Sequence, residues 1–276
     1  MHLTTDAIHR PRADAVPPSP RADREAEPPL VALVEALRAL GYASATVTPA
    51  THARVNARPR NARAGSLRDV FGWSRPFDEA LLPPPLFALM RRADVLARDG
   101  DGWRATIRVS SLDGDLLVHS AYPPSATDAV FFGPDTLRFV AAVTDHLGRR
   151  TRPVRRACDV GTGSGAGGIA VAKRAPGAEV VLVDVNPAAL RMAALNARLA
   201  GVASVVPCRS DLLAAVEGEF DLIVSNPPFM IDRSGRTYRD GGGRLGEGLS
   251  LAVVEAAAER LAPGGALVLF TGAVIV

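Results

Sequence analysis

The sequence predicts an α/β protein in which a doubly wound, Rossmann-like parallel sheet over residues 126–276 follows a smaller helical-plus-β-hairpin region over residues 30–125. Apolar runs such as EVVLVD (179–184) and FDLIVS (220–225) alternate with helical segments, which is typical of parallel strands buried on both faces. Glycine-rich or acidic residues follow these runs. The length of 276 residues also suits two domains of roughly 150 residues each.

The N-terminal part begins with residues 1–29, in which prolines and mixed charges predict a disordered tail. The pattern LVALVEALRAL predicts a helix from Leu30 to Gly41. Residues 67–98 predict short helices broken by the prolines at 83–85, and the Asp113-Gly114 turn predicts a β-hairpin.

The C-terminal part begins with a helix for which Asp135 or Thr136 is the expected N-cap. After it we expect strands at 154–160, 179–184, 203–208, 220–225 and 265–271, with helices at 165–175, 187–200 and 248–262. Right-handed connections between parallel strands place ligands beyond the carboxyl ends of the strands.

Composition excludes several classes of protein. Two cysteines, Cys158 and Cys208, lack any spacing typical of a disulfide framework or zinc site, so we expect no metal and a reducing, cytoplasmic setting. No run approaches the roughly 20 apolar residues of a membrane span. The 32 basic and 29 acidic residues nearly balance, so net charge names no partner.

The glycine-rich segment DVGTGSG (159–165) follows a strand and opens a helix, where backbone N–H groups can approach a ligand. The overlapping residues 163–168 (GSGAGG) also satisfy the dinucleotide pattern G-x-G-x-x-G, so a nicotinamide nucleotide and packing without ligand both stay open. The Asp159 carboxylate would repel a pyrophosphate. It suits a ligand with an ammonium group, such as S-adenosylmethionine (SAM).

Acidic residues end the next two strands. Asp184 can accept hydrogen bonds from two ribose hydroxyls, because Asn186 is the better N-cap for the following helix. Asp211 could accept from an adenine amine and the Leu212 N–H could donate to a ring nitrogen, although an ordinary loop acid is equally open.

The segment Asn226-Pro227-Pro228-Phe229 is the most specific motif. The prolines keep the backbone rigid, so the Asn226 side-chain oxygen and the Pro227 carbonyl can accept from one planar NH₂ group. Phe229 can stack on that group. A proline-rich turn is the alternative, but such a turn requires neither the asparagine nor the aromatic residue.

In order and spacing, these segments resemble the motifs of class I SAM-dependent methyltransferases. With FFGPDTLRF (131–139) and ALNA (194–197), the chain resembles the release-factor glutamine methyltransferases and the related small-domain N-methyltransferases of ribosomal RNA bases. The resemblance covers residues 130–276 by motif and residues 30–125 by architecture alone. That family's sheet continues into a terminal hairpin, which we expect this chain to lack.

The resemblance implies SAM as cofactor and methyl transfer by in-line positioning, without a histidine base. The residues implied to hold its methionine, ribose and adenine parts are, along the chain, Asp159, Gly161, Gly163, Gly165, Asp184, Asp211 and Leu212. Those implied to hold the acceptor are Asn226, Pro227 and Phe229. The segment 233–250, with Tyr238 and Arg239, is expected to be a mobile loop over the substrate or a flexible linker.

The expected function is SAM-dependent N-methylation of a planar nitrogen, with a protein glutamine amide ahead of an RNA base. The arginines at 54–68 and 149–156 are the observations that favour RNA. Two further alternatives stay open, namely a SAM-using enzyme with other chemistry, such as SAM cyclisation, and an NAD(P)-linked oxidoreductase. No membrane partner is expected.

Overall fold

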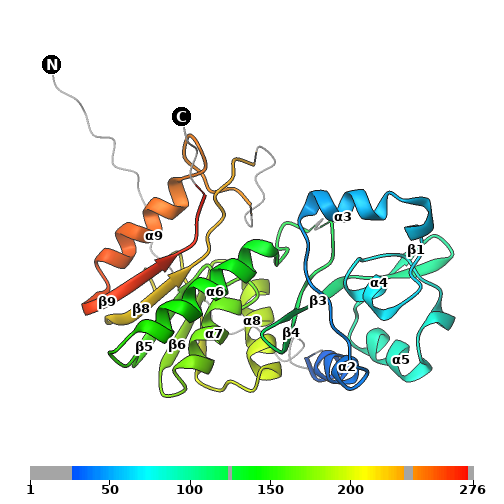
Figure 1. The fold of residues 1–276 in the computed structure, drawn as a ribbon, viewed down its shortest axis with the longest axis horizontal. Helices are drawn as coiled ribbons and strands as arrows, with labels where there is room; N and C mark the ends of the chain where they lie inside the picture. The colour runs from blue at the N-terminus through cyan, green and yellow to red at the C-terminus, as the bar shows by residue number, and fades with distance from the viewer. Residues whose placement is uncertain (1–26, 124–125, 233–238, 273–276) are drawn as a thin grey trace.

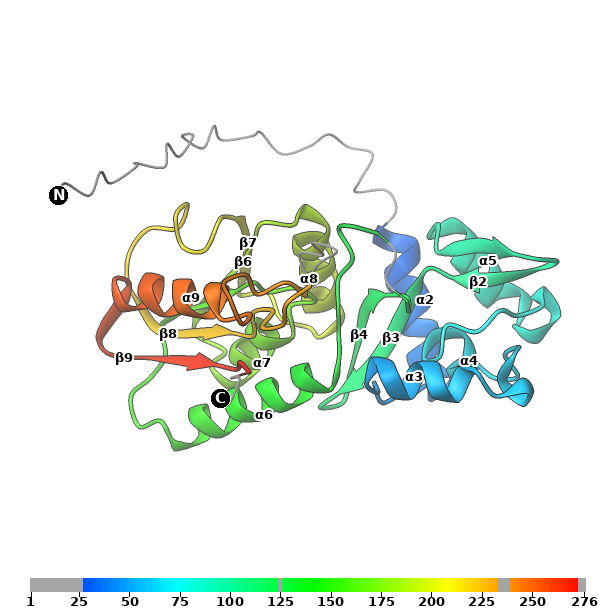
Figure 2. The same cartoon turned by 90° about the horizontal axis from the view of Figure 1, so that it is seen from above.

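The computed structural model describes residues 27–123, 126–232 and 239–272. A five-stranded parallel sheet in the order β7-β6-β5-β8-β9 confirms the predicted fold class. Figures 1 and 2 show this sheet on one side of the molecule and the N-terminal elements on the other. The strands are β5 (Arg156–Val160), β6 (Glu179–Asp184), β7 (Val205–Arg209), β8 (Phe220–Ser225) and β9 (Leu261–Leu269).

Helices cover both faces of the sheet. One face packs against α6 (Pro134–Arg149), α7 (Ala166–Arg174) and α8 (Pro187–Leu199), and the other packs against α9 (Gly248–Ala258). Strand residues therefore alternate between two apolar cores. In β8, Leu222 and Val224 face the first core and Ile223 faces the second. Both faces are buried, which explains the near-continuous apolar runs.

Several boundaries differ from the predicted ones. Gly133, and not Asp135 or Thr136, is the N-cap of α6, because Pro134 takes the first helical position with its preset φ. Asn186 caps α8 as predicted, and its side chain accepts from Ala188 N at 2.9 Å. The helix α9 ends before the predicted 262 and β9 begins before the predicted 265.

The N-terminal part contains helices and two separate hairpins. The helices are α2 (Glu27–Ala39), α3 (Pro49–Asn56), α4 (Leu67–Phe71) and α5 (Pro84–Arg92), with short 3₁₀ turns η1 (Pro59–Asn61) and η2 (Glu79–Leu81). The hairpins are β1 (Leu96–Asp99) with β2 (Gly102–Ala105), and β3 (Ile107–Leu112) with β4 (Asp115–Ser120).

Sequence analysis predicted the β3–β4 hairpin and its Asp113-Gly114 turn but missed the shorter β1–β2 pair. The prolines at 83–85 separate η2 from α5 as predicted, and Pro84 and Pro85 also form the first turn of α5, where no N–H is needed. The expected tail lies outside the described residues except at 27–29, which are helical.

Helix α8 lies between the two parts and contributes to both cores, and both views show it beside β4. Leu195 and Leu199 pack into the N-terminal core, while Ala193 and Ala197 pack against the sheet. Between them, the fully buried Asn196 accepts from Val118 N at 2.8 Å and donates to Val118 O at 2.9 Å and Ser164 O at 2.8 Å. One side chain thus joins β4, α8 and the glycine-rich loop.

Replacing Asn196 by alanine leaves three buried backbone groups without a partner. Each such loss costs about 1 kcal/mol or more, so we expect the free energy of unfolding to fall by about 3 kcal/mol in urea titrations. The matched control is Asn61→Ala, which removes a single hydrogen bond from Asn61 Nδ2 to Val55 O, with an expected loss of about 1 kcal/mol. Equal losses in the two variants would contradict the joining role of Asn196.

Candidate functional site

A cavity of about 190 Å³ lies at the carboxyl ends of the central strands. The described residues that line it come from the glycine-rich loop after β5, the ends of β6 and β8, the segment after β7, the start of α6 and the start of α9. Motifs separated by about 70 residues in the chain therefore meet at one edge of the sheet. Of the predicted site residues, those in the lining are Asp159, Gly161, Gly163, Asp184, Asp211, Leu212, Asn226 and Pro227.

The glycine-rich loop is fixed by hydrogen bonds to the neighbouring strand. Thr162 N donates to Val183 O at 2.9 Å, and Gly163 N donates to Asp184 Oδ2 at 3.0 Å. Gly165 is not among the described residues that line the cavity. It adopts φ +85° as the N-cap of α7, and a Cβ there would lie 3.0 Å from Ala193 Cα, so this glycine allows close packing against α8.

One carboxylate oxygen of Asp159 already accepts two hydrogen bonds from neighbouring residues. Its Oδ2 accepts from Thr162 Oγ1 at 2.8 Å and from Gly168 N at 2.7 Å, and the residue is only 1% exposed. Burial raises the pKa of this carboxyl to about 6, while the two hydrogen bonds act in the opposite direction. Asp159 therefore holds the loop together as well as lining the cavity.

Asp184 is also engaged by backbone groups. Gly163 N donates to its Oδ2, and Asn186 N donates to its Oδ1 at 2.9 Å. Burial raises the pKa of the Asp184 carboxyl, and these N–H groups lower it. Since Asn186 caps α8, Asp184 is available at the cavity wall, as expected.

The segment after β7 contributes Asp211 and Leu212 to the wall. Asp211 is exposed, and Leu212 adopts a left-handed φ of +49°. The next residues are anchored, because Leu213 and Val216 are buried in the core beside α9 and Ala215 N donates to Ser210 Oγ at 2.9 Å. The anchored turn keeps both wall residues at the edge of the cavity.

The segment 226–229, called the acceptor motif here after its expected role, follows β8, whose last residue Ser225 donates from Oγ to Val160 O at 2.7 Å. Asn226, Pro227 and Pro228 line the cavity. Phe229 is not among its described lining residues, and its ring lies against the backbone of Gly272, where a Cβ would be 2.6 Å from Phe229 Cδ2. The Phe229 ring thus packs against Gly272 and is not part of the described cavity wall.

The predicted mobile loop is only partly described. Tyr238 lies outside the described residues, and Arg239 is half-buried and not among those that line the cavity. The described part is packed onto the acceptor motif, since Gly241 N donates to Met230 O at 2.8 Å. Residues 239–250 are thus in contact with the segment after β8, and a role as a loop over the substrate stays a prediction.

Sequence reasoning missed the aromatic side of the cavity. Phe131, Thr136 and Phe139 line it from the start of α6, and Leu249 and Val253 line it from α9. The segment FFGPDTLRF carried the signal for the first three. Nothing in the sequence pattern of α9 marks Leu249 or Val253 as wall residues, because their position depends on how α9 packs on β9.

The arginines that favoured RNA lie outside the cavity. Arg156 begins β5, at the sheet edge opposite the cavity, and pairs with Glu179 at 3.0 Å, while Arg149 pairs with Asp145 at 2.8 Å. In the N-terminal cluster, Arg63 pairs with Asp78 and, at 3.3 Å, with Asp101. No Arg, Lys or His is found among the described residues of the cavity wall.

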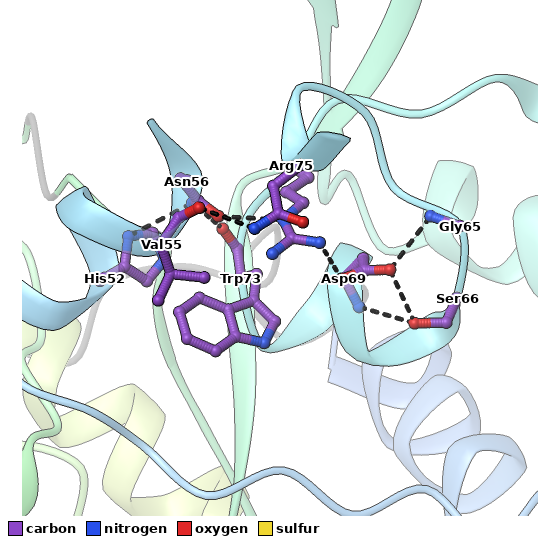
Figure 3. A network of polar contacts seen from close by, with 9 residues as sticks. His52, Val55, Asn56, Gly65, Ser66, Asp69, Trp73 and Arg75 are labelled. Atoms are coloured by element: carbon purple, nitrogen blue, oxygen red, sulfur yellow. Dashed lines mark hydrogen bonds and ion pairs between the residues drawn. The ribbon is translucent and has the colours of Figure 1, made fainter. Parts of the chain in front are cut away.

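Beside the N-terminal arginines, a polar network ties α3 to α4 (Figure 3). Arg75 pairs with Asp69 and donates to Asn56 Oδ1 at 2.9 Å, and Asn56 donates to Trp73 O at 2.9 Å. The His52 ring packs against Trp73 and Tyr122, and burial lowers its pKa to about 4. The side-chain polar groups of Asn56, Asp69 and Arg75 have partners within the protein, which gives the network a structural role, whereas His52 Nε2 is buried without a hydrogen-bond partner.

Within the described ranges, no group of three or more His, Cys, Asp or Glu residues could hold a metal ion. Cys158 and Cys208 are both free. None of the described helices is long and apolar enough to cross a membrane.

Comparisons with known proteins find similarity to methyltransferases. Residues 141–273 match the family model of the methyltransferase small domain. A release factor glutamine methyltransferase of Deinococcus radiodurans is 39% identical over 175 residues, which cover 60% of this chain and 62% of that protein. Another, of Bradyrhizobium diazoefficiens, is 41% identical over 131 residues, or 42% of this chain and 43% of that protein.

A ribosomal protein L11 methyltransferase of Pelotomaculum thermopropionicum is 37% identical over 115 residues, covering 41% of this chain and 35% of that protein. The chain therefore matches less than two thirds of the length of each of these relatives. The parallel sheet with its glycine-rich turn and acidic strand ends is the arrangement expected of a SAM-dependent methyltransferase. Residues 141–273 are similar to the methyltransferase small domain.

The raised pKa of Asp159 makes stability depend on pH. Between its value of 3.8 in an unfolded chain and about 6 in the fold, the native protein holds a proton that the unfolded chain has released, so raising the pH favours unfolding. Relative to Asp159→Asn, we expect the free energy of unfolding to fall by about 3 kcal/mol between pH 4 and pH 7, at about 1.4 kcal/mol per pKa unit. Urea titrations of both proteins without ligand measure this, and pH profiles that run parallel would contradict it.

Proposed function

We propose that this protein transfers a methyl group from SAM to a planar nitrogen, and that the nitrogen is the side-chain amide of a glutamine in a protein. One observation carries the proposal: Asn226 and Pro227 line the same cavity as Asp159, Asp184 and Asp211. The residues proposed to bind the amide and those proposed to bind the cofactor thus line the same cavity. The named relatives support a release factor as the protein that presents the glutamine.

The charge of the cavity wall supports SAM over a dinucleotide. The ionisable groups of its described residues are three carboxylates, those of Asp159, Asp184 and Asp211, with no basic side chain beside them. Such a wall attracts a sulfonium and an ammonium and repels the pyrophosphate of NAD(P). The same negative charge disfavours entry of a nucleic-acid backbone into the cavity. A protein amide is uncharged, so the wall does not repel it.

The donor and acceptor groups at the wall suit the parts of SAM. In this proposal Asp159 and the loop at Gly161 and Gly163 hold the methionine part, Asp184 holds the ribose, and Asp211 with Leu212 holds the adenine. Gly165 supports this loop because it allows the loop to pack closely against α8. SAM, when bound, supplies a methyl group that its sulfonium activates for transfer.

The acceptor segment orients the nitrogen. The Asn226 side-chain oxygen and the Pro227 carbonyl each accept a hydrogen from the amide NH₂. Both hydrogens are then held in the amide plane, so the nitrogen presents its face to the methyl group. Neither proline has an N–H that would compete for these oxygens. The rate gain comes from orientation, and no strong base is required. Phe229 supports the segment through its contact with Gly272, and turning toward the bound amide would be needed for it to stack.

Asn226→Ala tests this assignment. Loss of one hydrogen bond to the acceptor costs on the order of 1–3 kcal/mol, so we expect kcat/KM for a purified bacterial release factor to fall about 10- to 100-fold. SAM affinity by calorimetry is expected to stay within about twofold, and NAD is expected not to bind. The control is Asn61→Ala, whose side chain bonds within the N-terminal part and whose activity is expected to match the parent. Unchanged turnover in Asn226→Ala would remove the acceptor role.

A further inference from the structure

The described segment 240–249 lies directly on the backbone of the acceptor motif. Asp240 forms a parallel bridge with Met230, and Gly241 N donates to Met230 O. The Gly241 carbonyl in turn accepts from Leu249 N at 2.7 Å, and Leu249 lines the cavity. One residue, Gly241, therefore links the end of the acceptor motif to the first turn of α9.

Two glycines of this segment approach the motif more closely than any side chain would allow. A Cβ on Gly241 would lie 2.1 Å from Gly246 O, 2.7 Å from Pro228 O and 2.9 Å from Phe229 Cα. A Cβ on Gly246, which has φ +92°, would lie 2.6 Å from Phe229 O. Both positions thus require the absence of a side chain, and the obstacle is backbone that cannot rotate away.

The acceptor motif has few hydrogen-bond donors with which to fix its own position. Pro227 and Pro228 have no N–H group, so neither can donate a hydrogen bond to the strands or helices around it. The motif is anchored upstream by Ser225, and among the described residues the next backbone hydrogen bond downstream is the one from Gly241 N to Met230 O. The position of the Asn226 side chain therefore depends on the residues that pack against Pro228 and Phe229.

We propose that Gly241 and Gly246 are positioning residues for methyl transfer, because their close contact with the Pro228–Phe229 backbone fixes where the Asn226 amide-binding oxygen lies. This inference rests on the proposed function of Asn226 as the residue that holds the acceptor. Gly272 also packs against the motif, through the Phe229 ring.

Misplacement of a bound reactant by about 1 Å can cost on the order of 100-fold in rate. A methyl group at position 241 must displace Phe229 or the segment itself by a comparable distance. We expect Gly241→Ala to lower kcat for the acceptor about 10- to 100-fold. SAM affinity is expected to change less than about twofold, because Asp159, Asp184 and Asp211 are on other elements.

The chain offers a matched control one residue away. Gly242 has φ +66°, which makes alanine there at least as strained in its backbone, but a Cβ on Gly242 meets nothing within 4 Å. Gly242→Ala is expected to keep kcat within about twofold of the parent. Gly246→Ala is the second variant and is expected to lower kcat as Gly241→Ala does. Equal losses in Gly241→Ala and Gly242→Ala, or no loss in either, would overturn the proposal.

Hydrogen–deuterium exchange provides a measurement that needs no acceptor. In Gly241→Ala the amides of Phe229 and Met230 should exchange faster than in the parent, and in Gly242→Ala they should not. If the parent methylates no glutamine, the proposed function fails while this comparison still decides whether the glycines hold the motif. The same exchange in the two variants would contradict the positioning role.

Discussion

The three hydrogen bonds of Asn196 are the interaction on which the arrangement of this protein depends. Its fully buried amide joins Val118 in the N-terminal hairpin to Ser164 in the glycine-rich loop, through a helix that packs into both cores. An unsatisfied amide in this position would be costly, so the two parts and the loop are fixed together. The glycine-rich loop at the cavity and the N-terminal part are therefore held together through Asn196.

The charge of the cavity follows from the parallel sheet. Successive strands β5, β6 and β7 end at one edge, and each has an aspartate within two residues of its last residue. Burial raises the pKa of the Asp159 and Asp184 carboxyls, because their charged forms are held away from water at that edge. A cationic cofactor offsets the cost of burying these charges. In the proposed function, the same negative charge favours a neutral amide over a phosphate, so the proposed cofactor and the proposed acceptor suit the same cavity.

Much of the fold and the site could be predicted from the sequence because the signals were local. Buried strands appear as apolar runs, Asn186 is a cap by its side-chain chemistry, and parallel connections bring the strand ends together. What could not be predicted depends on contacts between distant segments. The packing of Gly165 on Ala193, the turn of the Phe229 ring toward Gly272 and the aromatic wall from α6 are of this kind.

The most direct measurement offers the protein two acceptors at once. A purified bacterial release factor and ribosomal RNA, at equal concentration, are incubated with tritiated-methyl SAM, and the label is then located by fractionation and peptide mass spectrometry. The account predicts label in the release factor, as one methyl group on a glutamine side-chain nitrogen. Label in the RNA, or on a protein residue other than glutamine, would contradict it.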